Sequence, residues 1–99
     1  MSKYVLTNRA VKDLKGIWNY TFDTWSENQA DKYYGQILNY CDRLSRNPEQ
    51  GKEYYNLHKG LRGSKINRHI IFYREISGSQ IEIERIFHER MDLKSRFVE

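Results

Sequence analysis

Residues 69–87 read HIIFYREISGSQIEIERIF, and this stretch decides the fold. Its first eight residues are rich in β-branched and aromatic side chains, and isoleucine alternates with glutamate over 81–84. The Ser-Gly-Ser sequence at 77–79 is typical of a hairpin turn. These features predict two antiparallel strands, 69–76 and 80–87. The alternation breaks at 85–87, which predicts a bulge or an emergence from the sheet.

Shorter elements flank this hairpin. Residues 61–66 predict a further strand, joined to the hairpin by a turn near Asn67. Residues 49–60 have the composition of a loop, and 3–6 predict a short strand at the N-terminus. We expect 91–98 to form a short basic tail with one helical turn.

The first half of the chain follows a helical period instead. Thr7 fits a helix N-cap. Apolar positions then recur at i, i+4, i+7, i+11 and i+15, as one face of a helix requires: Ala10, Leu14, Ile17, Thr21 and Trp25. A second row flanks this stripe: Val11, Trp18 and Phe22.

A second helix follows almost without a linker. Residues 26–29 read Ser-Glu-Asn-Gln, a capping box that opens a helix. Pro48 disfavours helical geometry at the residue before it, so we expect the helix to end near Arg46. Its stripe is Ala30, Tyr34, Ile37, Cys41 and Leu44, flanked by Tyr33, Leu38 and Tyr40. Two helices with so short a connection predict an antiparallel hairpin.

The predicted order is β-α-α-β-β-β, in a single domain over residues 1–99. Strands segregated from helices indicate an α+β fold, in which the helical hairpin packs on a mostly antiparallel sheet. The 99 residues include eight Tyr, four Phe and two Trp, a content that argues against intrinsic disorder. The net charge of +4 and the pI near 9.2 suit a nucleic acid or an acidic protein partner without choosing between them.

Several classes of site are absent from the sequence. The single cysteine, Cys41, allows no intramolecular disulfide and lies mid-helix, where a thiol is usually inert. His58, His69 and His88 lack zinc-site spacing, and residues 60–63 do not match a phosphate-binding loop. We therefore expect no metal and no cofactor. The chain shows no secretory signal and no membrane span, so we expect a cytoplasmic protein without membrane contact.

One basic set remains of interest: Arg62, Arg68, Arg74, Arg85, His88 and Arg90. These residues would lie on or just beyond the sheet. They could bind phosphate for RNA cleavage, with His88 as a general acid or base. Solvated strand positions or an interface with an acidic partner are the simpler explanation, because arginine is common on exposed sheet faces and is favoured at interfaces. Glu82 and Glu84 mark the wet side of their strand and could pair with arginines across the hairpin.

The flanks of the two helices carry more apolar surface than one stripe needs. Burial inside the helical hairpin explains most of it, but a groove for an amphipathic partner segment is the functional alternative. The residues of that candidate groove are Val11, Trp18, Phe22, Tyr33 and Tyr40.

An ordered set of short motifs runs nearly end to end. In the helical half it comprises Leu6-Thr7, Ala10, Asp13-Leu14, Ile17-Trp18, Tyr20, Trp25, Gln29-Ala30, Tyr34, Leu44, Asn47-Pro48 and Gly51. In the strand half it comprises Gly60-Leu61-Arg62, His69, Ile71-Phe72-Tyr73-Arg74, Ile83, Arg85-Ile86-Phe87-His88 and Arg90-Met91-Asp92. With these motifs the chain resembles the ParE/RelE toxin superfamily of type II toxin–antitoxin systems, and ParE most closely. Glu84 departs from the pattern, because an apolar residue is usual there.

The resemblance implies a toxin that poisons DNA gyrase and forms a hetero-oligomer with a ParD-like antitoxin, whose C-terminal segment wraps it. It implies contact with DNA only through the antitoxin or the gyrase complex, and no catalytic residues. The expected target-binding residues lie in 85–96: Arg85, His88, Arg90, Met91, Lys94 and Arg96. RelE-like members instead cleave mRNA on the ribosome, and Arg62, Arg85 and His88 would be the catalytic candidates here. An interaction module that has lost toxicity is a third possibility.

Overall fold

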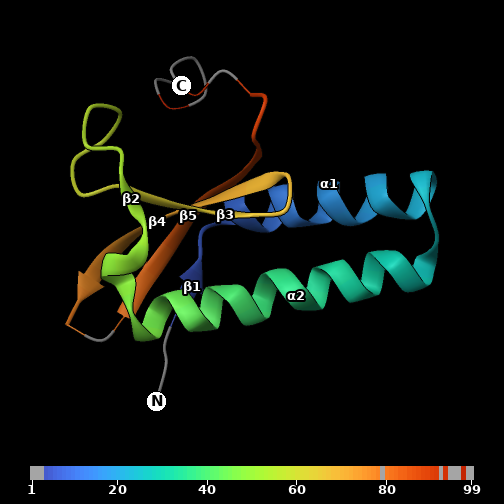
Figure 1. Cartoon of the computed structure of the whole chain (residues 1–99), viewed down its shortest axis with the longest axis horizontal. Coiled ribbons are helices and arrows are strands. Elements are labelled where there is room, and N and C mark those ends of the chain that lie inside the picture. Colours follow the sequence, from blue (N-terminus) through green and yellow to red (C-terminus); the bar gives the residue numbers. More distant parts are fainter. Residues whose placement is uncertain (1–3, 79, 92, 94–96, 98–99) are drawn as a thin grey trace.

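The fold is a five-stranded sheet with a helical hairpin on one face, in a computed structural model that describes residues 4–78, 80–91, 93 and 97 (Figure 1). The elements in chain order are β1 (Tyr4–Leu6), α1 (Asn8–Thr24), α2 (Glu27–Arg46), a 3-10 turn (Pro48–Gln50), β2 (Lys52–Glu53), β3 (Arg62–Ile66), β4 (His69–Ser77) and β5 (Gln80–His88). The predicted α+β fold and the order β-α-α-β-β-β are confirmed. The two-residue strand β2 is additional and lies in the predicted loop 49–60.

The strands lie in the order β1-β5-β4-β3-β2. The neighbours β2, β3, β4 and β5 pair antiparallel, whereas β1 pairs parallel with β5, so the sheet is mixed. Phe72 of β4 pairs with Arg85 of β5, but the next residue, Tyr73, pairs with Ile83. Glu84 is therefore the extra residue of a bulge. The bulge expected from the break in alternation is confirmed, and it explains why a glutamate occupies this strand position.

Both helices begin where their capping residues predict. The Thr7 hydroxyl accepts a hydrogen bond from the Ala10 backbone N–H at 3.0 Å. The Ser26 hydroxyl accepts one from the Gln29 N–H at 3.1 Å. The second helix ends at Arg46, two residues before Pro48, as predicted.

The sheet separates two hydrophobic clusters. The larger one lies under the helical hairpin and joins Ala10, Leu14, Ile37, Cys41 and Leu44 to Ile71, Tyr73, Ile81, Ile83 and Ile86. On the opposite face, Leu61, Phe72 and Phe87 are covered by Tyr54 and Leu57 from the segment after β2 and by Leu93 and Phe97. Side chains alternate between the two faces along β4, so one strand supplies both clusters.

Two residues of the predicted helical stripes are exposed. Trp25 is 74% exposed and Tyr34 is 39% exposed. Trp25 is exposed although it continues the stripe, because α1 ends at Thr24 and the tip of the hairpin extends beyond the sheet (Figure 1). Cys41, in contrast, is fully buried.

The chain is compact. Its Cα radius of gyration is 13.2 Å, close to the ~13 Å of a folded chain of about 100 residues. Among the described residues, no helix is both long enough and apolar enough to cross a membrane.

Candidate functional site

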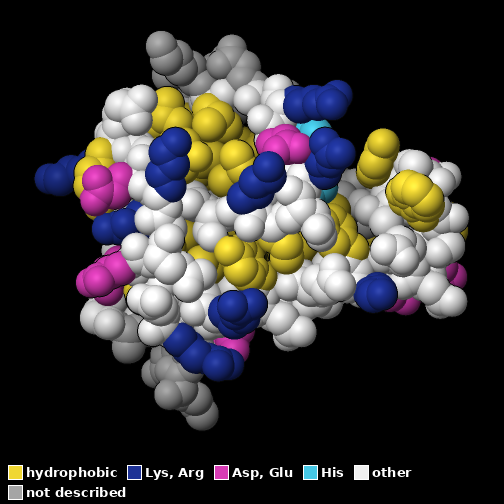
Figure 2. All heavy atoms as spheres, viewed as in Figure 1, with side chains coloured by type: hydrophobic (Ala, Val, Ile, Leu, Met, Phe, Trp, Pro, Cys, Tyr) yellow, Lys and Arg dark blue, Asp and Glu magenta, His cyan; other side chains and the backbone are white. Residues whose placement is uncertain are grey.

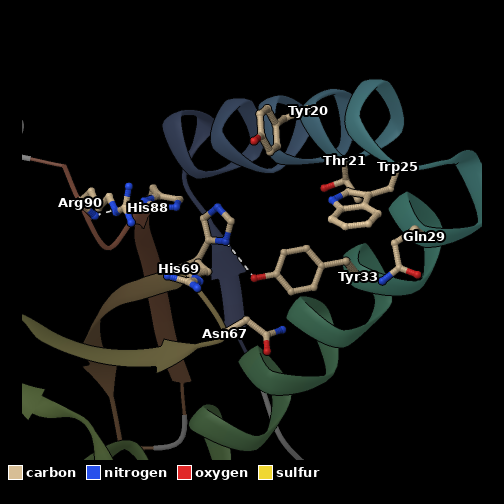
Figure 3. Close-up of a pocket in the computed structure, with 10 residues that line it drawn as sticks. Tyr20, Thr21, Trp25, Gln29, Tyr33, Asn67, His69, His88 and Arg90 are labelled. Carbon is tan, nitrogen blue, oxygen red and sulfur yellow. Dashed lines mark hydrogen bonds between the residues drawn. The ribbon is translucent and has the colours of Figure 1, made fainter.

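A cleft of about 630 Å³ opens where the helical hairpin extends past the end of the sheet. Its helical side is lined by Tyr20, Thr21, Trp25, Gln29 and Tyr33, and its sheet side by Asn67, Arg68, His69, His88 and Arg90 (Figure 3). Seen from outside, basic side chains and a histidine lie beside the indentation, and hydrophobic side chains lie on the projecting helices (Figure 2). We call this space the aromatic–basic cleft.

The floor of this cleft is a chain of three rings. The Tyr33 hydroxyl lies 2.8 Å from His69 Nδ1 and 3.2 Å from the Ile66 carbonyl oxygen. The hydroxyl can donate its proton to either of these atoms. The His69 and His88 rings meet edge to face, with centroids 5.4 Å apart. Burial lowers the pKa of the His69 imidazole below 6.5, and the neighbouring His88 lowers it further, while Glu89 opposes both effects. The two histidines pair across β4 and β5, which fixes their spacing.

The rim on the sheet side carries charge. Glu89 pairs with Lys65 at 2.7 Å and with Arg68 at 3.3 Å. The side-chain hydrogen bond from Lys65 is the main cause that lowers the pKa of the Glu89 carboxyl. Arg90 is exposed, and its backbone N–H donates to His88 Nδ1 at 3.2 Å. Three cations and one carboxylate leave this rim positively charged.

A second cleft, of about 390 Å³, adjoins the first between α1 and the end of β5. It shares Tyr20, His69 and His88 with the aromatic–basic cleft, and it is otherwise lined by Lys12, Asp13, Gly16, Ile17, Ile86 and Met91. Its lining surface is mostly apolar. We call it the apolar cleft.

Arg85, predicted as a target-binding or catalytic residue, is engaged within the fold. Its Nε and one terminal nitrogen donate to the Asp13 carboxylate at 2.9 and 3.1 Å. The same carboxylate accepts the Ile86 backbone N–H at 2.9 Å. The Arg85 guanidinium also lies 4.3 Å from the Phe87 ring centroid. Because β1 ends at Leu6, Asp13 takes the place of a neighbouring strand along this part of β5.

Arg62, another predicted catalytic residue, also makes structural contacts. Its guanidinium donates to the Gly51 carbonyl oxygen at 2.9 Å and lies 3.6 Å from a Glu53 carboxylate oxygen. Arg62 lies at the level of Tyr73 in the sheet, whereas His88 lies at the level of His69. Along β4, Tyr73 and His69 are four residues apart, which corresponds to roughly 13 Å of strand. The structure therefore does not bring Arg62 and His88 together.

The two glutamates of β5 pair across the hairpin, as predicted. Arg74 lies 3.6 Å from Glu82 and 3.4 Å from Glu84. The second ion pair is too poorly aligned for a hydrogen bond and leaves Arg74 Nε and Glu84 Oε2 buried without a hydrogen-bond partner among the described residues. Burial raises the pKa of the Glu84 carboxyl, and a hydrogen bond with Glu82 adds to the rise, while Arg74 opposes it.

The five residues of the predicted groove fall in two places. Trp18 donates to the Asp31 carboxylate of α2 at 3.0 Å and stacks on Phe22 with centroids 5.2 Å apart, so this pair lies at the seam between the helices. Val11 is on the same flank of α1. Tyr33 and Tyr40 turn toward the sheet instead, and the Tyr40 hydroxyl lies 2.6 Å from Ser64 Oγ.

Of the other predicted residues, His88 and Arg90 line the aromatic–basic cleft, and Met91 lines the apolar cleft. Lys94 and Arg96 lie outside the described residues. Sequence reasoning did not select Tyr20, Trp25, Gln29 or Asn67 for a site. The one available signal was Trp25 directly before the capping box, which placed a large ring at the hairpin tip. Within the described ranges, no three His, Cys, Asp or Glu side chains are grouped to hold a metal ion.

Comparison with solved structures identifies the class of fold. A chain of the chromosomal ParDE toxin–antitoxin system from P. aeruginosa superposes with a TM-score of 0.74, over 89% of this chain and 96% of that one, at 22% identity. At this level of identity the likeness concerns the fold alone.

Sequence comparison is more specific. The family model of the ParE toxin of type II toxin–antitoxin systems, parDE, matches residues 4–93. Toxin ParE1 of Mycobacterium tuberculosis is 33% identical over 93% of this chain and 94% of its own length. Toxin ParE1 of Caulobacter vibrioides is 32% identical over 96% of this chain and 97% of its own length. Toxin ParE of Escherichia coli is 31% identical over 100% of this chain and 96% of its own length. The chain belongs to the ParE toxin family.

Proposed function

We propose that this ParE-family toxin inhibits DNA gyrase by binding it and is neutralised by a ParD-like antitoxin. The observation that carries the proposal is the family match, which covers residues 4–93 and leaves neither the helical hairpin nor the sheet outside it. Gyrase acts on chromosomal and plasmid DNA, so the proposed place of action is the cytoplasm.

Binding, rather than RNA cleavage, agrees with how the arginines are used. Arg85 is paired with Asp13 and its side chain is only 17% exposed. Arg62 holds the segment around Gly51, and strand spacing separates it from His88. An RNase needs its phosphate-binding and proton-transferring groups around one scissile bond. The described arrangement of these three residues does not favour the RelE-like alternative.

The seam between α1 and α2 is the surface that we propose for the antitoxin. Phe22 is 44% exposed although it stacks on Trp18, so an apolar partner face would remove this aromatic surface from water. Val11 extends the same flank by two helical turns from Trp18. An amphipathic helix lying along a helical seam is a common recognition mode. Tyr33 and Tyr40 contribute through packing beneath α2 rather than through this surface.

For the target, we propose the C-terminal end of β5. His88, Arg90 and Met91 gather there, at the junction of the two clefts. Lys94 and Arg96 follow in the chain, and we include them among the proposed target-binding residues because they are positively charged. Arg85 supports this surface from within by holding β5 against α1.

A supercoiling assay tests the target. Purified chain added to gyrase and relaxed plasmid should inhibit supercoiling, and protein denaturation should then release linear DNA from trapped cleavage complexes. Arg90→Gln should weaken inhibition, whereas Arg46→Gln, on the exposed end of α2, serves as the matched control. Normal supercoiling at saturating chain would rule out gyrase as the target.

Two further assays separate the alternatives. Ribosomes programmed with mRNA should show no cleavage by the wild-type chain, and cleavage that His88→Ala abolishes would establish the RNase instead. For the antitoxin, the product of a neighbouring ribbon-helix-helix gene should co-purify with the chain. Phe22→Asp should reduce that complex and Tyr55→Asp, another exposed aromatic position, should not. An undiminished complex with Phe22→Asp would remove the seam from the interface.

A further inference from the structure

The two adjoining clefts differ in chemistry. Among the described residues that line the aromatic–basic cleft, none is aliphatic: the walls consist of aromatic rings, amides, a hydroxyl, imidazoles and guanidinium groups. The apolar cleft beside it contains Ile17, Ile86 and Met91. An amphipathic helix lays its apolar face into a hydrophobic groove. The apolar cleft suits such a segment better than the aromatic–basic cleft, whose walls carry charged and amide groups.

The helical side of the aromatic–basic cleft presents two exposed rings. Trp25 is 74% exposed and Tyr20 is 68% exposed, the highest values among the large hydrophobic residues that the structure describes. The backbone of Trp25 is held, because its N–H donates to the Thr21 carbonyl oxygen at 2.8 Å. Exposed aromatic faces on a fixed backbone are the platforms on which unpaired nucleobases stack.

The opposite side supplies positive charge. Glu89 is shared by Lys65 and Arg68, so it offsets only one of these two cations. Arg90 adds a third cation, and no described carboxylate lies within ion-pair distance of it. Gln29 and Asn67 also line this cleft and bring two amide groups to its walls (Figure 3). Amides donate to and accept from the edges of bases.

From this arrangement we propose that the aromatic–basic cleft binds a segment of one or two nucleotides of single-stranded nucleic acid. A base stacks on Trp25 or Tyr20, and Arg68 and Arg90 hold the phosphate. A volume near 630 Å³ is of the size of small-ligand sites. The proposal replaces the expectation that the toxin reaches DNA only through its antitoxin or gyrase. It does not depend on gyrase being the target.

Fluorescence anisotropy with a labelled oligonucleotide of eight deoxythymidines tests the proposal on the purified full chain. Trp25→Leu should weaken binding about tenfold or more, the range found when a stacking ring is removed. Arg90→Gln should weaken binding and reduce the slope of log affinity against log salt by about 0.7, the value for one phosphate contact on a single strand. Tyr55→Leu and Arg46→Gln, both exposed positions outside the cleft, should leave affinity unchanged. Circular dichroism would verify that each variant is folded.

Three results would overturn the proposal. The first is no binding of the oligonucleotide at low salt. The second is an equal loss of affinity in the Tyr55→Leu and Trp25→Leu variants. The third is equally strong binding of an octamer of glutamate, which would reveal a general site for acidic peptides. Because the assay contains no gyrase, its failure leaves the supercoiling test unaffected, and failure of the supercoiling test leaves this one unaffected.

Discussion

Asp13→Ala should destabilise the chain more than a substitution on an exposed helix surface would. The Asp13 and Arg85 side chains are 15% and 17% exposed, and the carboxylate accepts two hydrogen bonds from Arg85 and one from the Ile86 backbone. Its removal leaves a mostly buried guanidinium without its partner and an N–H without an acceptor. Breaking a buried ion pair costs about 3–5 kcal/mol, and the remaining exposure places this one near the lower end, at about 3 kcal/mol.

Urea unfolding followed by circular dichroism measures this loss directly. In a chain of about 100 residues a loss of ~3 kcal/mol corresponds to a fall in melting temperature of roughly 12–24 °C. Asp13→Asn should lose less, because its amide oxygen still accepts from Ile86. A double-mutant cycle with Arg85→Met should give a coupling energy of about 2 kcal/mol. If Asp13→Ala changed the unfolding free energy by less than ~0.5 kcal/mol, a typical surface effect, the structural role of Arg85 would be refuted.

Three further expectations concern other parts of the fold. Gly51→Ala would drive a methyl group into the Tyr73 hydroxyl and should cost about 1–3 kcal/mol of unfolding free energy, whereas Gly35→Ala, with open space around it in α2, should gain roughly 0.5–1 kcal/mol. The folded state lowers the pKa of His69, so the contribution of neutral His69 to the unfolding free energy should be fully present above pH 6.5 and should fall as the pH drops below it. Urea midpoints measured from pH 7.5 to 5 should show this fall. An equal fall with His69→Gln would contradict the assignment to His69. Burial raises the pKa of the Cys41 thiol to about 12, so alkylation at pH 8, followed by mass spectrometry, should require denaturant; rapid labelling of the folded chain would contradict it.

Local signals in the sequence predicted the elements well. Thr7 and Ser26 start their helices through hydrogen bonds to residues three positions on, so their effect is readable without a fold. The broken alternation at 85–87 predicted a bulge or an emergence from the sheet, because side-chain direction in a strand depends only on neighbouring residues. Strand β2 was missed since two residues, Lys52 and Glu53, are too short to show any period.

The site was less predictable because distance in sequence hides its contacts. Arg85 looked available for a target until α1 brought Asp13 against it from 72 positions away. Trp25 continued a buried stripe by period, but burial also needs a surface to cover it, and the sheet does not reach the hairpin tip. His88 and Arg90 were selected by charge, and the structure adds Tyr20 and Trp25 opposite them.

The pairing of β1 with β5 has a consequence for synthesis. The Thr7 hydroxyl, which caps α1, donates to the Glu84 carbonyl oxygen 77 positions later, and β1 has β5 as its strand neighbour. A ribosome releases the N-terminus first, so the first strand must wait until β5 has been synthesised before it finds its place. A chain terminated before residue 80 lacks the strand between β1 and β4 and cannot assemble the sheet. Products that end before β5 should therefore be inert, and toxicity should begin only after β5 has been synthesised.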